Sequence, residues 1–587
     1  MNILQVMKWQ ESVLFTPNRK MKTKKKINMN IVDLHVHSNK SDGSMTPTEL
    51  VNYALEKGLS AFALTDHDTT DGIEEALKAA EGKPIEVIPG IEFSSEYEGK
   101  DIHIVGLYID YQSAFFKRRL KAFVNGRIIR NKEMCKRLTE HGMPITYEEL
   151  IAEFPNCVIT RSHYAEYLLN HGYTKSRKEA FDRFIGDNCP CFVPRKKITP
   201  MRAVEIILKA GGIPILAHPL LYGMSNARLD KLVATLKDMG LAGLEAVYCT
   251  YSPAEERQMR TLAAKYNLCI SGGSDFHGNA KPGLDLATGY GKLFIPEEIL
   301  TKLKEKHEDM KANPEQLKRT KILFTDLDGT FLDKNKQIGD YTREVLDAWS
   351  KAGHKFVLCS GRDINSVGHV KEYLKLDYPG MYLIGYNGGQ IVDCATGKTL
   401  YKITLSYQQI QHLFEEAKKQ GIHIHTYTDT NIISPADDDQ LHYYQRVIKT
   451  PVIISEDAKE VAQSGACKCI AIELEDKEKL EAFRTSLLPW AKEEGITMLY
   501  SNPYYLELFP SASGKGAAVK KLCEMLGINP LLSIAAGDAE NDISMIQAAG
   551  MGIAMINGTD DVKNVATTIT EFDNNHDGLA HTLVDLI

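Results

Sequence analysis

Short apolar runs alternate with helical patterns over two long stretches of the chain. In the first stretch, buried strands are predicted at 31–34, 61–64, 87–91, 104–107, 213–217, 244–248 and 268–271. Most of these runs end next to His, Asp or Glu. In a β/α barrel, the carboxyl ends of the strands form the catalytic face. The pattern therefore predicts an α/β fold with about seven barrel strands and a polar cluster at one end.

The first of these strands ends in two histidines with one residue between them. Because side chains along a strand repeat every two residues, His35 and His37 leave the backbone on the same side and can reach one ion together. Asp42 follows in a Ser-Asp-Gly turn. Imidazole and carboxylate together indicate a catalytic transition-metal site. A strand with incidental polar residues is the alternative for a lone pair of this kind. Other strands add candidate ligands at His67, Glu92, His103, His218, Asp275 and His277.

These motifs as a set resemble those of the PHP (polymerase and histidinol phosphatase) superfamily over about residues 29–295. The resemblance implies a distorted β/α barrel that holds two or three divalent ions, Mn²⁺, Zn²⁺ or Fe²⁺, and hydrolyses phosphate esters. Clustered cations neutralise phosphate oxygens and activate water near neutral pH. Glu92 would bridge the ions. Carried over by position, the implied ligands are His35, His37, Asp42, His67, Glu92, His103, His218, Asp275 and His277.

Between about 111 and 197 the strand pattern gives way to helical stretches rich in Arg and Lys, which we interpret as an insertion over the barrel mouth. Its segment 159–163 resembles the Gly-Arg-x-His segment of the PHP subgroup that contains nucleoside bisphosphate phosphatases and RNase AM-like 5′-to-3′ exoribonucleases, with Thr160 in place of glycine. The resemblance implies that Arg161 and His163 hold a phosphate, for which a planar guanidinium is well suited. A surface salt bridge is the alternative for Arg161, and Arg195 is a weaker candidate for the same role.

The stretch 296–319 is predicted to be a charged helix interrupted at Asn313-Pro314. Because it shows no buried stripe of its own, the segment 296–320 is interpreted as a linker. A second enzyme domain is predicted at 321–587, where an apolar strand ends in Asp326-Leu327-Asp328-Gly329-Thr330. Two carboxylates at this spacing can divide nucleophilic attack and proton transfer between them. A calcium-binding loop is the alternative, but no bidentate Glu follows at the right distance.

Three further strand-end motifs follow in this domain: Ser360-Gly361-Arg362, Ser513-Gly514-Lys515-Gly516, and Gly537-Asp538 with Asn541-Asp542. A hydroxyl and exposed amides at a helix start suit phosphate oxygens, and acids suit magnesium. With the first motif, they resemble the four signature motifs of the haloacid dehalogenase (HAD) superfamily, in its Cof-type branch. The resemblance implies a Rossmann-like core, and residues from about 393 to 505 are predicted to form an α+β cap.

The same resemblance implies a role for each motif residue. Asp326 would be the nucleophile that forms an aspartyl-phosphate, and Asp328 the general acid/base. Ser360, Gly361, Lys515 and Asn541 would bind the phosphoryl group. The implied Mg²⁺ ligands are Asp326, Asp328 through its carbonyl, and Asp538. Asp542 would contact these ligands or bind the ion through a water molecule. Asn387 matches the Asn-Gly segment of this branch.

Length, charge and cysteine content limit the number of domains, the kind of partner and the cellular compartment. The 587 residues require two or three domains, and a net charge of −7 gives no overall attraction to long nucleic acid. Eleven scattered cysteines indicate reduced thiols, and no apolar window of membrane-spanning length occurs, so we expect a cytoplasmic protein with no membrane association. Residues 1–28, which include a basic run, are expected to be a disordered extension.

We therefore expect a bifunctional, metal-dependent phosphoesterase that acts on a small phosphorylated metabolite or a short oligonucleotide. The N-terminal half would act on a nucleoside 3′,5′-bisphosphate or a short RNA 5′ end, and the C-terminal half on a sugar phosphate or nucleotide. Two alternatives stay open. The N-terminal half could be a histidinol-phosphate-type phosphatase, or one half could sense a ligand and regulate the other.

Overall fold

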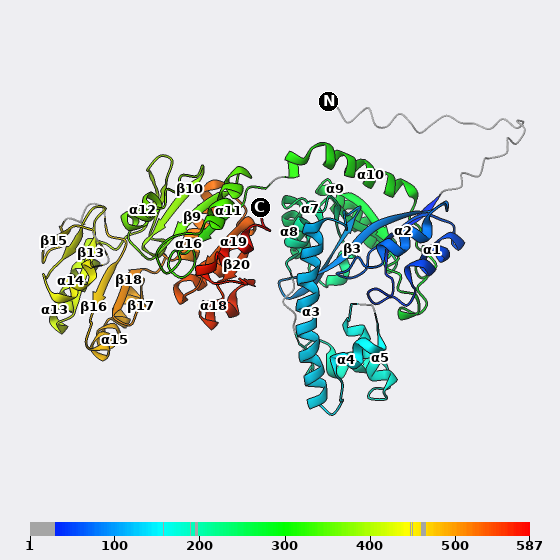
Figure 1. The fold of residues 1–587 in the computed structure, drawn as a ribbon, viewed down its shortest axis with the longest axis horizontal. Coiled ribbons are helices and arrows are strands. Elements are labelled where there is room, and N and C mark those ends of the chain that lie inside the picture. Colours follow the sequence, from blue (N-terminus) through cyan, green and yellow to red (C-terminus); the bar gives the residue numbers. More distant parts are fainter. Residues whose placement is uncertain are drawn as a thin grey trace, which may run out of the picture. The chain divides into compact units, whose positions relative to one another are not determined.

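The computed structural model describes residues 30–155, 158–187, 189–193, 198–317, 319–446, 448, 450–459 and 465–587. The predicted extension at 1–28 and Arg195 lie outside the described residues. The chain divides into two compact units, Met1–Pro314 and Glu315–Ile587, which are drawn in Figure 1. None of the described helices has the length and apolar character that a membrane crossing requires.

The N-terminal unit is built on one seven-stranded sheet whose spatial order follows the chain order, β1 to β7. The β3–β4 and β4–β5 pairs are antiparallel and the other neighbours are parallel. The segment that follows β7 closes the sheet on the end of β1, since the Asp275 N–H donates to the His35 carbonyl and the His37 N–H to the Phe276 carbonyl, both at 2.9 Å. The predicted barrel of about seven strands is confirmed. The strands are β1 (Ile31–Val36), β2 (Leu59–Leu64), β3 (Glu86–Tyr97), β4 (Lys100–Leu107), β5 (Ile213–Leu216), β6 (Gly243–Tyr248) and β7 (Cys269–Gly273).

Helices surround this barrel, as Figure 1 shows. Local sequence sets where they begin: Thr46 and Glu49 form a capping box at α1, and Ser252 and Glu255 form one at α9, each with proline at the first helical position. The helices are α1 (Pro47–Glu56), α2 (Ile73–Ala80), α7 (Pro200–Lys209), α8 (Asn226–Asp238), α9 (Pro253–Lys265) and α10 (Glu297–Ala312).

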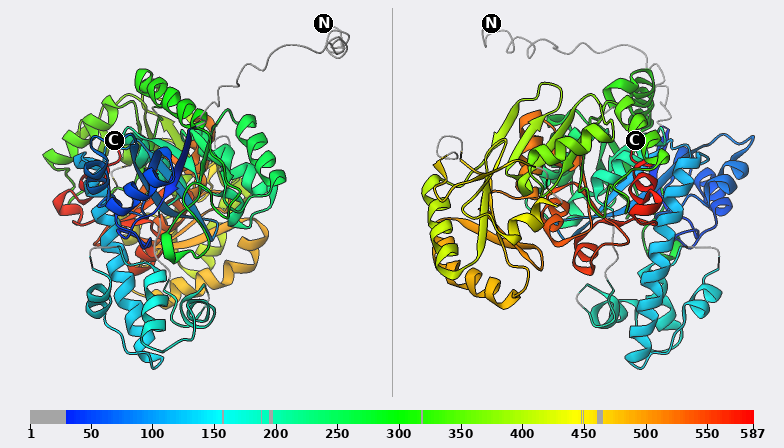
Figure 2. Two further views of the ribbon diagram at one scale, coloured as in Figure 1. Left: turned by 90° about the vertical axis from the view of Figure 1, so that its right-hand side faces the viewer. Right: turned by 60° about the vertical axis from the view of Figure 1, so that its left-hand side comes forward.

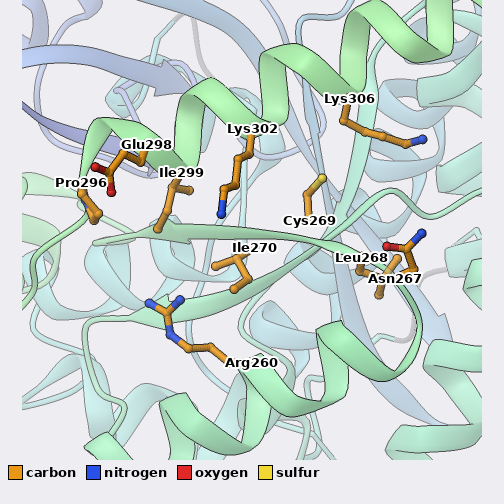
Figure 3. Close-up of a pocket in the computed structure, with 10 residues that line it drawn as sticks. All are labelled: Arg260, Asn267, Leu268, Cys269, Ile270, Pro296, Glu298, Ile299, Lys302 and Lys306. Carbon is orange, nitrogen blue, oxygen red and sulfur yellow. The ribbon is translucent and has the colours of Figure 1, made fainter. Parts of the chain in front are cut away.

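Helix α10 corrects the prediction of a linker at 296–320. Its residues Ile299, Leu300, Leu303 and Met310 are buried, and the helix packs against β7 and β1 of the barrel. The stripe was missed because charged residues separate its members, although their spacing is helical. A pocket of about 380 Å³ lies between α10, α9 and β7. Figure 3 shows Lys302 among the side chains that line it.

The insertion forms a lobe with its own apolar core, and both views in Figure 2 show it projecting from the barrel. It nevertheless contacts loops that carry candidate ligands: the Val158 N–H donates to the Lys40 carbonyl at 2.9 Å, and Arg177 donates to the Ala280 carbonyl at 3.4 Å. Its helices are α3 (Ala114–Glu140), α4 (Tyr147–Glu153), α5 (Arg161–Asn170) and α6 (Arg177–Ala180).

The core of the C-terminal unit is an eight-stranded sheet in the order β12-β11-β10-β9-β8-β19-β20-β21. From β10 to β21 the neighbours are parallel, which confirms the predicted Rossmann-like core, and β11 and β12 extend it antiparallel. The elements are β8 (Ile322–Thr325), α11 (Asp340–Lys351), β9 (Lys355–Cys359), α12 (Ile364–Tyr373), β10 (Met381–Gly385), β11 (Gln390–Asp393), β12 (Thr399–Lys402), α16 (Lys515–Leu526), β19 (Ser533–Gly537), α17 (Ile543–Ala548), β20 (Met551–Ala554), α18 (Asp560–Val565), β21 (Thr568–Ile569) and α19 (Gly578–Leu583).

A second sheet of six strands, in the order β15-β14-β13-β16-β18-β17, forms the cap between β12 and α16. Its limits differ from the predicted 393–505, because β12 pairs with β11 in the core sheet and β18 continues to Pro510. The elements are α13 (Tyr407–Gln420), β13 (His423–Tyr427), β14 (Ile432–Ser434), α14 (Asp439–Gln445), β15 (Val452–Ile454), β16 (Cys469–Ile472), α15 (Lys477–Glu493), β17 (Ile496–Asn502) and β18 (Tyr505–Pro510).

Candidate metal centres

All nine candidate ligands of the N-terminal unit come together at one end of the barrel. They fall into overlapping groups whose ligand atoms all lie within 4.8 Å of one another. Glu92 belongs to two groups, one with His35 and His218 and one with His67 and His103. The remaining groups are His35, His37 and Asp275, and His37, Asp42, His67 and His277.

Glu92 lies at the centre of this cluster and is buried. Its Oε2 lies 3.2 Å from His35 Nε2 and 3.0 Å from His67 Nδ1, and its Oε1 lies 2.8 Å from His103 Nδ1. Among the described residues, His35 Nε2, His67 Nδ1 and Glu92 Oε2 have no hydrogen-bond partner of acceptable geometry despite this proximity. Lone pairs that converge without hydrogen bonding suit divalent cations placed between them.

The electrostatics of the cluster are those of a carboxylate among imidazoles. Burial favours the neutral form of Glu92, but the charges of His35, His67 and His103 hold its pKa well below its usual range. The imidazoles respond differently. Burial lowers the pKa of His67 to about 3. Burial is outweighed at His35 and His37, because Glu92 and Glu245 raise the pKa of His35 well above its usual range, and Asp275 and Glu92 raise the pKa of His37 to about 9. Metal ligation would therefore require His35 and His37 to release protons.

The backbone is in unusual conformations where two of the ligands project from strand ends. His218 has a φ of 26° and Asp275 a φ of 57°, both in the left-handed region. The loop before Asp275 is held by the buried carboxylate of Asp33, which accepts from the Ser274 N–H at 2.9 Å and from its hydroxyl. Strained backbone at such positions is typical of sites where geometry serves function.

Three residues around the cluster were not singled out from the sequence. Glu245 accepts from His35 Nδ1 at 3.2 Å and from the backbone N–H of His218 at 2.7 Å, which fixes the ring of His35 and the backbone at His218. The Tyr248 hydroxyl and the Lys281 ammonium both donate to Asp275 Oδ2, at 2.7 and 2.5 Å. Glu245 lies on β6, a predicted strand, but no motif marked it, and Lys281 lies in a loop.

Arg161 and His163 take part in other contacts. Arg161 donates to Asp187 at 2.6 Å, lies 3.8 Å from Asp101, and covers the ring of Phe192. The Thr160 N–H donates to His163 Nδ1 at 3.0 Å at the start of α5. Asp101 precedes the candidate ligand His103 by two residues on β4, so Arg161 lies on the side of the barrel that carries the cluster. A phosphate role for the two residues stays a prediction.

The C-terminal unit gathers a second, different cluster at the ends of β8 and β19. Asp326, Asp538 and Asp542 offer carboxylate oxygens within 4.8 Å of one another. The buried Lys515 at the start of α16 donates to Asp326 at 2.5 Å and to Asp542 at 2.6 Å. Burial raises the pKa of Asp326 to about 7, opposed by Lys515, and raises that of Asp538 to about 6. A divalent cation would complete the charge balance of these acids, so the residues fit magnesium.

Asp328 is not part of this group of three acids. Its carboxylate contacts two cations to which the sequence analysis gave no role. Arg362 donates to the two oxygens of the Asp328 carboxylate at 2.8 and 2.7 Å, and Lys336 donates to it at 2.6 Å. Burial favours the neutral form, but these cations lower the pKa of Asp328, so the side chain is ionised at neutral pH. Arg362 was visible in the Ser-Gly-Arg motif, whereas Lys336 lies outside any motif.

Several predicted phosphate-binding residues lie close to one another in the loops that follow the core strands. Ser360 is buried at the end of β9, and its hydroxyl accepts from the Arg362 N–H at 3.2 Å. The Asn387 N–H donates to the Ser360 carbonyl at 3.1 Å, and the Asn541 side chain lies 3.5 Å from that of Asn387. Gly361 faces Asn387 so closely that a Cβ would lie 2.9 Å from its Oδ1, which explains the glycine.

Comparison with known proteins assigns each unit. A PHP domain family model matches residues 33–181, and a haloacid dehalogenase-like hydrolase model matches residues 323–583. The chain is 38% identical over 245 residues to a 5′-3′ exoribonuclease of Haemophilus influenzae, covering 42% of this chain and 89% of that protein. It is 32% identical over 256 residues to a 3′,5′-nucleoside bisphosphate phosphatase of Chromobacterium violaceum, covering 43% and 90%.

A third relative matches the C-terminal half of the chain. The chain is 32% identical over 289 residues to a 5-amino-6-(5-phospho-D-ribitylamino)uracil phosphatase of Bacillus subtilis, covering 46% of this chain and 98% of that protein. Each relative thus covers less than half of this chain.

Proposed function

Because the chain belongs to both the PHP and the haloacid dehalogenase-like families, and is a hydrolase of phosphoric ester bonds, we propose that it carries two independent phosphoesterase sites. One site is the cluster around Glu92, and the other is the cluster around Asp326. The single observation that supports two sites is that candidate metal ligands cluster in each of the two units. A unit that had become a regulator would be expected to have lost ligands.

In the N-terminal unit, the nine clustered side chains would hold two or three divalent ions, Mn²⁺, Zn²⁺ or Fe²⁺. When bound, such ions neutralise phosphate oxygens and activate a water molecule. The protein fixes the ligands: Glu245 orients the ring of His35 and holds the backbone of His218, and Lys281 holds Asp275. The insertion, through its contacts with the loops next to Asp42 and His277, would limit access to small or thin substrates.

We assign a nucleoside 3′,5′-bisphosphate or a short RNA 5′ end to this site. Both relatives of the N-terminal half act on such compounds according to their names. Arg161 lies on the strand-end side of the barrel and would exchange its surface carboxylate partner Asp187 for a substrate phosphate. A histidinol-phosphate-type activity is the second candidate, and it would need no guanidinium at this position.

In the C-terminal unit, Asp326 would attack the phosphorus atom of a phosphomonoester. A bond forms between its carboxylate oxygen and phosphorus while the ester P–O bond breaks. Because the Asp328 carboxylate is ionised at neutral pH, it would first take up a proton from water and then give it to the leaving oxygen. Water then cleaves the acyl-phosphate, with Asp328 as the base that takes its proton. Lys515 neutralises charge beside the nucleophile, and Mg²⁺, held by the three clustered acids, would neutralise the phosphoryl oxygens.

The experiment that tests this proposal compares wild type, His35→Ala and Asp326→Asn on three substrates. These are adenosine 3′,5′-bisphosphate, a short 5′-phosphorylated RNA, and a sugar phosphate, all with Mn²⁺ and Mg²⁺ present. We expect His35→Ala to abolish only bisphosphate or RNA turnover and Asp326→Asn only sugar-phosphate turnover. If either substitution abolishes all three activities, the two sites are not independent and one unit regulates the other.

A further inference from the structure

A buried ion pair in the cap contacts the predicted phosphate-binding loops of the core. Lys468 precedes β16 and Glu507 lies on β18, and their charged groups are 3.0 Å apart. Their side chains are 2% and 6% exposed. Burying a charged pair costs free energy, so its retention calls for a role.

The Lys468 ammonium reaches out of the cap to a core loop. It donates to the carbonyl of Gly361 at 2.8 Å. That carbonyl belongs to the peptide unit whose N–H, on Arg362, donates to the Ser360 hydroxyl oxygen at 3.2 Å. Since a peptide unit is planar, fixing the carbonyl also fixes the direction of this N–H, and with it the Ser360 hydroxyl.

The Glu507 carboxylate reaches the same residue by another route. It accepts from the Asn387 side chain at 2.8 Å, and the Asn387 N–H donates to the Ser360 carbonyl at 3.1 Å. Asn387 has a φ of 53°, in the left-handed region, so an external contact is needed to keep it there. Both members of the pair thus act on Ser360.

We propose that Lys468 and Glu507 are positioning residues by which the cap holds the Ser360 hydroxyl in place for phosphate binding in the core. The inference rests on the proposed phosphatase activity of the C-terminal unit. It assigns the cap a second task besides covering the site, because the phosphate pocket is fully ordered only while the cap strands β16 and β18 lie against it.

The chain contains a matched control in the same cap. Lys479 lies 3.0 Å from Glu473 and donates to the backbone carbonyl of Gly421 at 2.7 Å, so it repeats both contacts of Lys468. All three of these residues belong to the cap. Lys479→Met therefore removes the same chemical groups without touching a core loop.

The test measures kcat and KM for p-nitrophenyl phosphate, and the Kd of inorganic phosphate with Mg²⁺, in the full-length protein. We expect Lys468→Met to lower kcat/KM and weaken phosphate binding on the order of 100-fold, because small misplacement at a reacting centre has large effects. Glu507→Gln keeps an acceptor for Asn387 and should lose about 10-fold. Lys479→Met should change neither quantity.

A double-mutant cycle separates positioning from general stabilisation. If Lys468 acts through Ser360, then Ser360→Ala in the Lys468→Met protein should add little further loss. Full additivity, or a lower Tm with unchanged kcat/KM and phosphate Kd, would overturn the inference. Should Lys468→Met fail to fold, Glu507→Gln decides by the same measurements. If wild type turns over no phosphomonoester at this site, the proposed function fails, and phosphate Kd alone then tests the positioning role.

Discussion

The two candidate metal centres differ in how the negative charge of their buried carboxylates is balanced. The N-terminal cluster places the imidazoles of His35, His37, His67, His103, His218 and His277 around the carboxylates of Asp42, Glu92 and Asp275. The C-terminal cluster consists of three acids, and a buried ammonium, Lys515, contacts two of them. Neutral imidazoles offer lone pairs to metal ions but no positive charge, whereas Lys515 already supplies a cation. The first site is therefore expected to need several ions and the second only one.

The largest expected effect is the loss of the shared ligand. Glu92→Gln removes the carboxylate that five imidazoles approach, so bound metal in the N-terminal unit should fall to less than half and its activity by on the order of 10³-fold. Metal analysis of the purified protein and turnover of adenosine 3′,5′-bisphosphate measure both. Unchanged metal content would show that Glu92 bridges nothing. Sugar-phosphate turnover serves as the internal control.

Lys515→Met probes the opposite arrangement. Without the ammonium, Asp326 and Asp542 lose their shared partner, and we expect phosphomonoester turnover to fall by about 10²–10³-fold. Because more Mg²⁺ can then enter to balance the acids, part of the loss should be recovered at high Mg²⁺. The comparison fails if Lys515→Met retains wild-type kcat at ordinary Mg²⁺, since the ammonium would then do nothing that the metal does not.

A smaller effect on metal binding is expected from Glu245, which contacts two candidate ligands of the N-terminal cluster. Glu245→Gln weakens the hold on His35 and His218 without removing a ligand, and metal affinity should fall about 10–100-fold. Activity at saturating Mn²⁺ should be largely restored, which distinguishes this variant from Glu92→Gln. Titration of the metal-free protein with Mn²⁺ gives the affinity. An equal Mn²⁺ affinity in wild type and variant would contradict the orienting role of Glu245.

The smallest effect on activity is expected from α10. Leu303 is fully buried, so Leu303→Ala should lower the free energy of unfolding of the N-terminal unit by about 2–5 kcal/mol. Turnover at 25 °C should be unchanged at both sites. Thr301→Ala, at an exposed position of the same helix, should change stability by no more than about 0.5 kcal/mol. Calorimetry of the two variants checks this, and equal transitions would return α10 to the role of a linker.

Much of the fold was predictable because the motifs lie at strand ends. Runs such as 31–34 and 322–325 are short, apolar and followed directly by acids or histidines, so strand type and site residues came from one pattern. The helix α10 was expected from the sequence, but its packing on the barrel was not. Its buried positions 299, 300, 303 and 310 are diluted by lysine and glutamate, and only the barrel surface shows which of them face inward.

The candidate ligands could be predicted from the sequence, but the residues that contact these ligands and hold them in place could not. His35 and Asp326 stand in spaced motifs, whereas Lys281 and Lys336 contact Asp275 and Asp328 from loops whose path no local pattern specifies. The same holds for Lys468, which touches Gly361 from 107 residues away. Contacts of this kind depend on how the sheets fold up, and a single sequence carries no signal for them.

The closure of the barrel has a consequence for biosynthesis. Asp33 on the first strand is satisfied by Ser274, 241 residues later, and β1 completes its pairing with the residues that follow β7. A ribosome that has released only the first six strands has therefore made a sheet with an open edge and an incomplete ligand set. Ions cannot be fully enclosed until the last strand has emerged. The two candidate ligands Asp275 and His277 would join the set only after β7 has been made, so metal binding would depend on completion of the barrel.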